Sequence, residues 1–290
     1  MHGRFDLPGN DIPGPIPGTS ASISQRIRSY GLVDLSFCNR EGRTRLDRTL
    51  QSGCLRMRSP RGEDAPCAVL INTAGGVAEG DCLDHRIAWE EGAVATVTTQ
   101  AAEKIYRALA AGCRISNNMT VARGARAEWL PQETILFDAA RLYRDARIVL
   151  EDDVTFLGLE AVVLGRTAMG ETVRSGSLRD RMRIWRNGRL IYADTLALDG
   201  DVAALMQRAA VGGGARAMAV IVHASAEAAA MLVPVREAIE GAQGLAAAST
   251  WNGLLAVRLL APDGETLRHD IALALSALRE GRPLPRVWRC

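Results

Sequence analysis

The feature that most constrains the fold of this chain is an alternation of apolar and polar residues, which runs with interruptions from about Arg26 to Leu198. A period of two is typical of strands with one face in a core, because successive side chains of a strand point to opposite faces. The alternation is most regular in three segments: His85–Trp89, Ile115–Val121 and Leu178–Ile184. The sequence therefore predicts a mainly β body.

One hairpin can be placed from its turn. Asn187-Gly188 separates the alternating segment that ends near Arg186 from the segment that begins at Arg189 and continues through Tyr192. Asn-Gly tolerates the two positive φ angles of a type I′ turn, whose twist matches that of the flanking strands. We expect two antiparallel strands joined here.

The pattern changes after about Asp199, where alanine, leucine and methionine become frequent. These residues favour helices, and Pro234 should kink or divide the second of them. The predicted helices are Val202–Val211, Ala226–Glu240 and Thr266–Arg279, and the predicted strands are Ala217–Val222 and Leu254–Leu260. The expected fold class is mainly β, α+β in the broad sense: a multi-stranded antiparallel or mixed sheet body with a few helices toward the C-terminus.

The domain organisation expected from the sequence is simple. With 290 residues, of which 48% are hydrophobic, the chain can bury a sizeable core. Residues 1–25 are rich in proline and glycine and are expected to form a disordered tail. No linker or fixed-period repeat follows, so residues 26–290 are predicted to be a single domain.

Charge and cysteine content limit the partners and the compartment. The 35 basic and 33 acidic residues nearly cancel, and the basic runs Arg43–Arg48 and Arg179–Arg189 fit solvated strand faces, so neither nucleic acid nor a membrane surface is an expected partner. No window reaches the ~18 uninterrupted apolar residues needed to span a bilayer. Six scattered cysteines without a C-x-x-C pair suit a reducing compartment. We expect a cytoplasmic protein.

The residues do not assemble a recognisable catalytic constellation. There is no G-x-S-x-G sequence, and the four histidines do not fall within helical or strand reach of one another. Cys82 and His85 are three positions apart on a predicted strand and would point to opposite faces, so two separately packed residues are the favoured interpretation.

A glycine-rich loop is the most unusual short segment. Gly75 and Gly80 have the glycine spacing of a phosphate-binding loop, but Asp81 and Cys82 replace the lysine and the hydroxyl that such a loop requires. An anion would be repelled by this carboxylate. The glycines are therefore expected to shape the chain, through positive φ angles or close backbone approach.

Several carboxylates accompany this loop and the apolar segments: Glu79, Asp81, Asp84, Glu133, Asp138, Glu160 and Glu171. Oxygen ligands with open coordination could hold a divalent ion weakly and release it. The alternative is that Asp81 and Asp138 cap turns. Further on, Thr98-Thr99-Gln100 leads into Ala101–Arg107, which is compatible with a short capped helix or with a binding surface.

Five segments in this order resemble the family of urease accessory proteins called UreD, or UreH in some organisms. The resemblance covers the chain from about residue 28 to its C-terminus, and together the five segments are specific although each alone is weak. They are Asn72–Asp81, Thr98–Arg107, Trp129–Phe137, Leu164–Glu171 and Arg282–Trp288.

The resemblance implies a mainly β, non-catalytic maturation factor that binds apo-urease and helps to deliver nickel to its active site. It implies contact with the accessory protein UreF and, through UreF, with the GTPase UreG. Nickel would be in transit through an internal polar passage, with no cofactor bound tightly. By position in the matching segments, the metal-contacting residues would be Asp81, Glu133 and Glu171, with Gln100 beside them and Gly75, Gly76 and Gly80 shaping the loop.

One position departs from the family pattern, because many relatives have glycine where this chain has Glu79. A side chain there argues against a positive φ angle but could add a carboxylate ligand. Two other functions stay open: a purely structural adaptor that does not contact nickel, and a hydrolase with Asp81 and Glu133 as acid and base.

Overall fold

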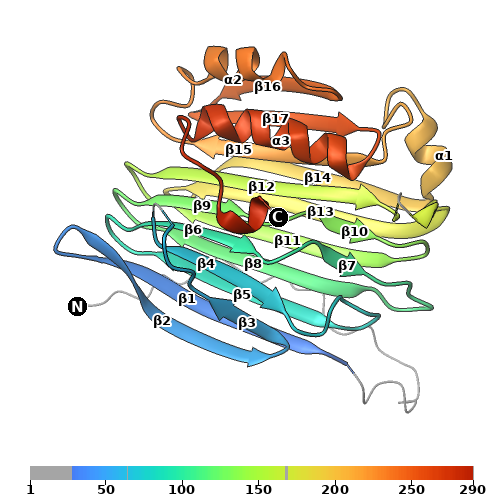
Figure 1. The fold of residues 1–290 in the computed structure, drawn as a ribbon, viewed down its shortest axis with the longest axis horizontal. Helices are drawn as coiled ribbons and strands as arrows, with labels where there is room; N and C mark the ends of the chain where they lie inside the picture. The colour runs from blue at the N-terminus through green and yellow to red at the C-terminus, as the bar shows by residue number, and fades with distance from the viewer. Residues whose placement is uncertain (1–27, 64, 167–168, 290) are drawn as a thin grey trace.

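The computed structural model describes residues 28–63, 65–166 and 169–289. It confirms a mainly β fold, built from two large mixed sheets with three α-helices toward the C-terminus (Figure 1). The predicted tail of residues 1–25 lies outside the described residues.

The first sheet, sheet A, has seven strands. In spatial order they are β14 (Arg189–Asp201), β13 (Ser175–Arg186), β11 (Arg141–Leu150), β8 (Cys113–Val121), β5 (Cys82–Trp89), β1 (Tyr30–Arg40) and β2 (Arg43–Gly53). The second sheet, sheet B, has ten. Its main path is β16 (Leu245–Trp251), β17 (Leu254–Ala261), β15 (Ala217–Ala224), β12 (Thr155–Leu164), β9 (Arg126–Leu130), β6 (Val94–Thr99), β4 (Cys67–Asn72) and β3 (Leu55–Arg58). Beside this path, β10 (Thr134–Leu136) pairs with β12 and with β7 (Glu103–Ile105).

Between β4 and β13 the chain winds back and forth between the sheets like a coil. The strands β5, β8, β11 and β13 are parallel neighbours in sheet A. The strands β4, β6, β9 and β12 are parallel neighbours in sheet B, and each lies between two sheet A strands in the sequence. Each turn of this coil therefore adds one strand to each sheet.

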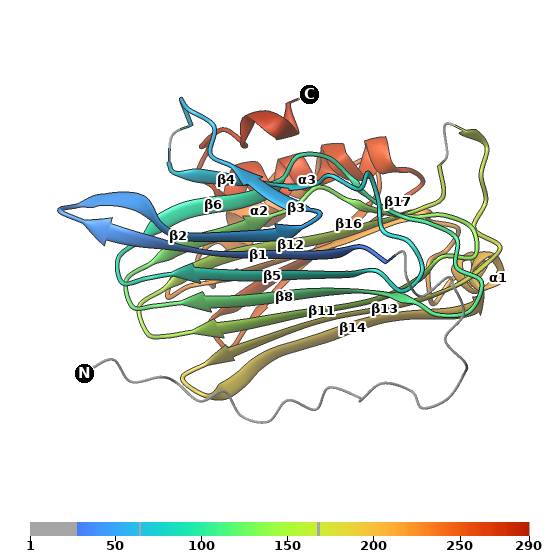
Figure 2. The same ribbon diagram turned by 90° about the horizontal axis from the view of Figure 1, so that it is seen from below.

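The molecule has three layers, which Figure 2 shows from the side: sheet A, sheet B and the layer of α2 (Leu232–Ile239) and α3 (Gly264–Leu278). One core fills the space between the sheets, and a second lies between sheet B and the helices. β12 is buried along nearly its whole length because both of its faces are covered. In the alternating segments predicted from the sequence, which lie in sheet A, every second side chain points toward sheet B.

The predicted hairpin is confirmed. Arg186 pairs with Arg189 across a two-residue turn in which Asn187 has φ 49° and Gly188 has φ 76°. These angles are those that a type I′ turn requires. The basic run that ends here lies on strand faces, where Arg181 and Arg183 pair with Asp145 of β11.

The predicted helices are present but shorter at several ends. The first, α1 (Val202–Gln207), does not reach Val211, because Arg208 already has an extended backbone. The second does not begin at Ala226. α2 begins at Leu232, which places Pro234 in the first turn, where the missing N–H has no partner to lose. α3 begins after Asp263, whose carboxylate accepts a hydrogen bond from Thr266 N.

The segment Ala101–Arg107 is not a helix, so that interpretation was wrong. Glu103–Ile105 forms β7, and its Ile105 is buried between the exposed Lys104 and Tyr106. The segment adds to sheet B by pairing in parallel with β10. These ladder hydrogen bonds to a distant part of the chain outweigh the local preference for a helix.

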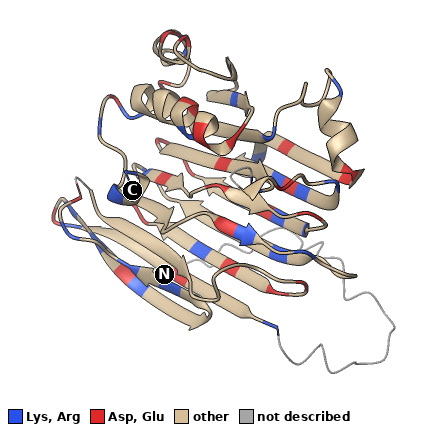
Figure 3. Cartoon of the chain, turned by 45° about the vertical axis from the view of Figure 1, so that its right-hand side comes forward, with Lys and Arg blue, Asp and Glu red and all other residues tan. Residues whose placement is uncertain are grey.

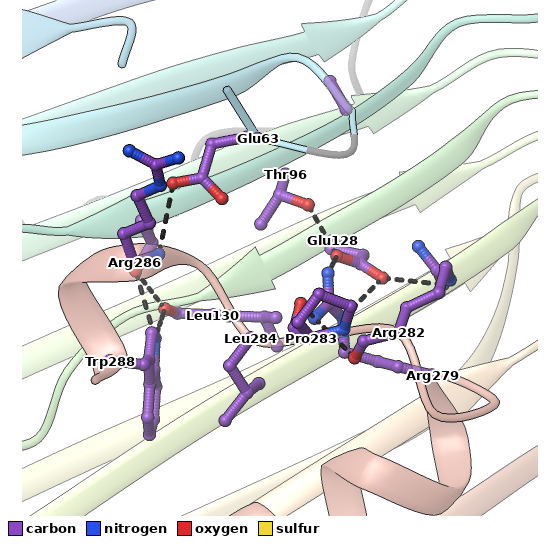
Figure 4. Close-up of polar contacts among 12 residues, drawn as sticks. Glu63, Thr96, Glu128, Leu130, Arg279, Arg282, Pro283, Leu284, Arg286 and Trp288 are labelled. Carbon is purple, nitrogen blue, oxygen red and sulfur yellow. Dashed lines mark hydrogen bonds and ion pairs between the residues drawn. The ribbon is translucent and has the colours of Figure 1, made fainter. Parts of the chain in front are cut away.

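The C-terminal segment crosses sheet B and ties it to α3. In Figure 4, Arg279 and Arg282 converge on Glu128 of β9, and the indole of Trp288 points at the carbonyl of Leu130. A short 3-10 helix, Arg286–Trp288, ends this segment. The end of the chain is therefore fixed by contacts with residues about 150 positions earlier.

Charges of both signs are interspersed over the strands and helices in the view of Figure 3. This distribution agrees with the near balance of basic and acidic residues in the sequence. None of the helices among the described residues is both long and apolar enough to cross a membrane.

Candidate functional site

The glycine-rich loop joins β4 of sheet B to β5 of sheet A, and its glycines shape the chain as expected. Gly75, Gly76 and Gly80 all have positive φ angles, of 75°, 157° and 79°. At Gly76 the backbone approaches the ring of Tyr106 so closely that a Cβ atom would lie 2.4 Å from a ring carbon. This approach lets the Tyr106 hydroxyl donate a hydrogen bond to the Gly75 carbonyl, at 2.9 Å.

Asp81, at the end of the loop, is buried and accepts hydrogen bonds from two backbone amides. Its Oδ1 lies 2.7 Å from Ser29 N and its Oδ2 lies 2.8 Å from Ala78 N. Both oxygens therefore help to hold the turn together, as in the capping interpretation of this residue. The same contacts fix the point at which the chain enters sheet A.

Glu79, where the resemblance led us to expect glycine, is accommodated without strain. It is not among the residues with positive φ, and its two carboxylate oxygens accept hydrogen bonds from Leu109 N (2.7 Å) and Ala111 N (2.9 Å). These amides, Ala111 foremost, lower the pKa of the Glu79 carboxyl. The side chain thus connects the glycine loop to the loop that precedes β8.

The other two predicted metal-contacting residues, Glu133 and Glu171, interact with arginines. Glu133 lies 3.5 Å from a guanidinium nitrogen of Arg268. Glu171 pairs with Arg166 at 2.8 Å and also accepts hydrogen bonds from the Arg166 and Asp138 amides. These bonds, with that of the Arg166 side chain foremost, lower the pKa of Glu171. The structure does not bring Asp81, Glu133 and Glu171 into one cluster, since each has its own separate partners.

Gln100 and Gly75 instead lie at a cavity between the two sheets. This cavity, which we call the first cavity, has a volume of about 180 Å³ and includes the β7 residue Glu103 in its wall. Burial raises the pKa of Glu103 to about 7, although the hydrogen bond from Asn72 acts in the opposite direction. Asp81, Glu133 and Glu171 are not among the lining residues.

Deeper in the first cavity, polar side chains replace apolar ones on the inner faces of both sheets. His85 Nδ1 lies 2.9 Å from Asn117 Oδ1, on the neighbouring strand. Across the core, Glu160 Oε1 accepts hydrogen bonds from Asn117 Nδ2 (3.3 Å) and from the indole of Trp129 (3.2 Å). Burial lowers the pKa of His85, although the hydrogen bond with Asn117 acts in the opposite direction. Asn117 of sheet A and Trp129 of sheet B thus hold one oxygen of a buried carboxylate.

The other oxygen of Glu160 faces a buried arginine on β11. Glu160 Oε2 lies 2.7 Å from Arg144 Nη1, and Arg144 also donates two hydrogen bonds to Asp180 of β13, at 2.9 Å and 2.6 Å. A further bond goes from Nη1 to Thr134 Oγ1, at 2.8 Å. Burial raises the pKa of Glu160, against the effect of the Arg144 charge. One guanidinium therefore bridges two carboxylates in the space between the sheets.

A second cavity, of about 270 Å³, begins at the same carboxylates. Glu160 and Asp180 line it at one end, and Asp194 and Arg258, which form an ion pair at 2.9 Å, line it elsewhere. Arg258 is exposed to solvent over most of its side chain. Because the two cavities share Glu160, a line of polar side chains extends between the sheets from Gln100 past Arg144 toward Arg258, within walls that are otherwise mostly apolar.

The sequence profile of the UreD urease accessory protein family matches residues 29–289. The chain belongs to the UreD family. Curated UreD proteins are 46% identical to it in Azorhizobium caulinodans, over 92% of this chain and 99% of the relative, and 48% identical in Rhizobium etli, over 92% and 98%. The UreD protein of Xanthobacter autotrophicus is 45% identical over 96% of each chain.

Membership of the UreD family confirms the function expected from the resemblance. The protein is a urease accessory protein involved in urease maturation, and it is not an enzyme. The hydrolase alternative is therefore wrong. Nor does any contact among the described residues join Asp81 to Glu133, which were the acid and base of that alternative.

Of the polar residues between the sheets of this UreD protein, Gln100 and Glu160 were candidates from its sequence, whereas His85, Asn117, Arg144 and Asp180 were not predicted as site residues. A signal was present, because His85, Asn117 and Asp180 stand in the inward positions of alternating strands otherwise filled by residues such as Ile87 and Met119. A polar residue at an apolar position of a half-buried strand marks a buried polar group. The pairing of Arg144 with Glu160 had no comparable signal, since they lie on different sheets.

Proposed function

We propose that this UreD protein is a scaffold that binds apo-urease, associates with UreF and through it with UreG, and conveys nickel in transit between its two sheets. The observation that carries the proposal is the pair of cavities that share Glu160 and a few further polar side chains in otherwise mostly apolar walls. A polar path through a protein interior has a cost in buried charge, which a purely structural scaffold would have no reason to retain. Passage of an ion is a function that would require it.

The chemistry of the path suits a cation that must leave again. Its walls offer carboxylate, amide and hydroxyl oxygens, from Glu103, Gln100 and Thr134 among others. Nickel prefers nitrogen and sulfur ligands, and beside these oxygens the first cavity offers it a single imidazole, that of His85, so the wall would hold nickel weakly. Among the described residues there is no group of three His, Cys, Asp or Glu side chains placed to hold a metal. The proposal is therefore transit, with nickel as cargo.

The surface beside the first cavity supports contact with apo-urease. Tyr106, whose hydroxyl binds the Gly75 carbonyl, is exposed together with Leu109 (82% exposed) and Met169 (74%). Exposed apolar side chains that gather at one end of a molecule are typical of protein interfaces. An ion that leaves the first cavity near Gln100 would be delivered beside this surface. We assign the surface to apo-urease, and the helix layer, where Val233 is exposed, to UreF.

We also propose a cytoplasmic location for the protein and its partners. The five cysteines in the described part of the chain are free thiols, as a reducing compartment requires.

The decisive experiment co-expresses apo-urease and the other accessory proteins with this chain, with no copy of it, or with a variant. Urease activity and nickel content should depend on the chain. Ala102→Trp places a large ring in the wall of the first cavity. This variant should still co-purify with urease and UreF, but the urease matured with it should contain less nickel. Ala193→Trp, at an exposed position of β14, is the matched control and should behave as wild type.

The same experiment separates transit from a purely structural adaptor. An adaptor would support activation equally well with tryptophan at position 102 or 193, and that outcome would remove nickel transit from the proposal. Urease activation that is independent of the chain would remove the whole proposal. For the docking surface, Leu109→Glu should weaken co-purification with apo-urease. Leu190→Glu, at the hairpin on the opposite end of sheet A, should not.

A further inference from the structure

The guanidinium of Arg144 lies where the two cavities meet. Arg144 and Glu160 line the first cavity, and Glu160 and Asp180 line the second. The Arg144 side chain is buried, and it contacts Glu160 on sheet B and Asp180 on the neighbouring strand of sheet A. Any cation that moved from one cavity to the other would meet this fixed positive charge.

The two carboxylates depend on that charge. Glu160 is 4% exposed, and its Oε2 accepts no well-aligned hydrogen bond from the residues the structure describes, so its contact with Arg144 is an ion pair. Asp180 directs both of its oxygens at the same guanidinium. Without a cation at this position, two carboxylates would be buried close together with no compensating charge, which is strongly unfavourable.

We propose that Glu160 and Asp180 form a latent site for a divalent cation, which the guanidinium of Arg144 occupies at rest and which nickel enters by exchange with it. The proposal rests on the proposed function for its cargo. The oxygen atoms that Arg144 contacts now would become the ligands: those of Glu160, Asp180 and the Thr134 hydroxyl. Two carboxylates and a hydroxyl make a weak site for Ni²⁺, as exchange demands.

Exchange also explains how nickel could pass along the path although Arg144 blocks it at rest. When Glu160 and Asp180 are both ionised, the guanidinium between them leaves this part of the path with a net charge of minus one, which attracts a cation toward the junction. Once the ion has replaced the guanidinium, return of the tethered arginine displaces the ion again. Arg144 is thus a competitor built into the site, which prevents nickel from staying there.

The test is Ni²⁺ binding by the purified full-length chain, measured by equilibrium dialysis at about pH 8, where carboxylates are ionised. Arg144→Gln removes the competing charge and should bind Ni²⁺ roughly tenfold or more tightly than wild type at one site per chain. The double variant Arg144→Gln/Glu160→Gln should lose this gain. Arg144→Lys keeps a positive charge at the site and should not gain it.

Stability supplies a second readout, because Arg144→Gln buries unpaired carboxylates. Its melting temperature should rise on addition of Ni²⁺ and not of Mg²⁺, whereas the melting temperature of Arg144→Lys should not change. If Arg144→Gln does not fold in either condition, Arg144→Gln/Asp180→Asn leaves a single carboxylate and should still bind Ni²⁺ more tightly than Arg144→Lys. The inference is wrong if no folded variant that lacks the guanidinium binds Ni²⁺ more tightly than wild type. It is also wrong if the tighter binding persists when Glu160→Gln is added.

These outcomes are distinct from failure of the proposed function. If urease activation requires the chain but Arg144→Gln gains no Ni²⁺ binding, the latent site proposed here is wrong and the scaffold function stands. If Arg144→Gln binds Ni²⁺ more tightly while urease activation proceeds without the chain, the latent site stands and the scaffold function is wrong.

Discussion

Arg279, at the end of α3, binds Glu128 of β9 with two hydrogen bonds, from Nε to Oε1 at 3.1 Å and from Nη2 to Oε2 at 3.0 Å. Both side chains are buried, and Arg282 donates a third bond to Oε1 from a more exposed position. Thr96 of β6 donates its hydroxyl to the other oxygen. One carboxylate of sheet B therefore holds the C-terminal end of α3, in addition to the apolar core between the helices and the sheet.

Loss of this carboxylate should destabilise the whole molecule. Glu128→Ala leaves the buried Arg279 without its partner, and we expect a loss of about 3–5 kcal/mol in the free energy of unfolding. Arg282→Ala removes only the half-exposed arm of the same cluster, so about 0.2–1 kcal/mol is expected. Denaturant unfolding of both variants measures the difference. Equal losses would mean that burial of the pair contributes nothing.

Gly76 should be intolerant of a side chain. Gly76→Ala would place a Cβ atom 2.4 Å from the Tyr106 ring and 2.9 Å from the Lys104 carbonyl oxygen, so the loop or the ring must move. Gly75→Ala meets no atom within 4 Å and has only the cost of a positive φ angle, about 1 kcal/mol. Thermal unfolding should therefore show a larger loss for Gly76→Ala. A smaller loss than for Gly75→Ala would show that the contact with Tyr106 is not tight.

Asp81→Ala should reduce stability, because it leaves the amides of Ser29 and Ala78 without an acceptor. An unsatisfied buried donor costs about 1–3 kcal/mol. Asp81→Asn keeps one acceptor oxygen and should lose less. The measurement is the midpoint of urea unfolding for the three proteins. Lower urease activation by a fully stable Asp81→Ala would instead favour a direct contact with nickel, as the sequence first suggested.

Stability should depend on pH through Glu103. Its pKa in the folded protein is about 7, above the usual value of a carboxyl group in an unfolded chain, so the folded state binds more protons between about pH 4.5 and 7. The free energy of unfolding contributed by this group should therefore fall as the pH rises through that window. Glu103→Gln, which still offers an oxygen to Asn72, should be more stable than wild type at pH 8 and lose this advantage at pH 4.

The control for the last experiment is Glu79, whose pKa is lowered. Glu79→Gln should show the opposite trend, with its deficit present at neutral pH and lost in acid. Melting curves at both pH values measure these trends. If the difference in stability between Glu103→Gln and wild type does not depend on pH, the raised pKa of Glu103 is wrong.

Much of the fold was predictable from the sequence because half-buried strands have a strong period. The segments around His85, Ile115 and Leu178 and the Asn187-Gly188 turn are where they were expected. The errors have local causes. Ala101–Arg107 contains good helix formers but joins a sheet edge, and the helix predicted from Ala226 begins only at Leu232.

The candidate site was less predictable, because it depends on which faces meet. Gln100 and Gly75 line the first cavity, yet Glu133 and Glu171 interact with arginines outside it. Sequence motifs locate residues along the chain, whereas a shared cavity depends on the stacking of two sheets. The contact between Arg144 and Glu160 arises only from that stacking.

The coiled winding of β4 to β13 also limits how such a chain can change in length. The side chains of His85, Asn117, Arg144 and Asp180 reach the same interior from successive turns of the coil, because each stands at an inward position in the two-residue alternation of its own strand. A single insertion or deletion within any of these strands would reverse the faces of every residue beyond it. Evolution could therefore lengthen or shorten the connections between strands freely, while the strands themselves could accept only substitutions.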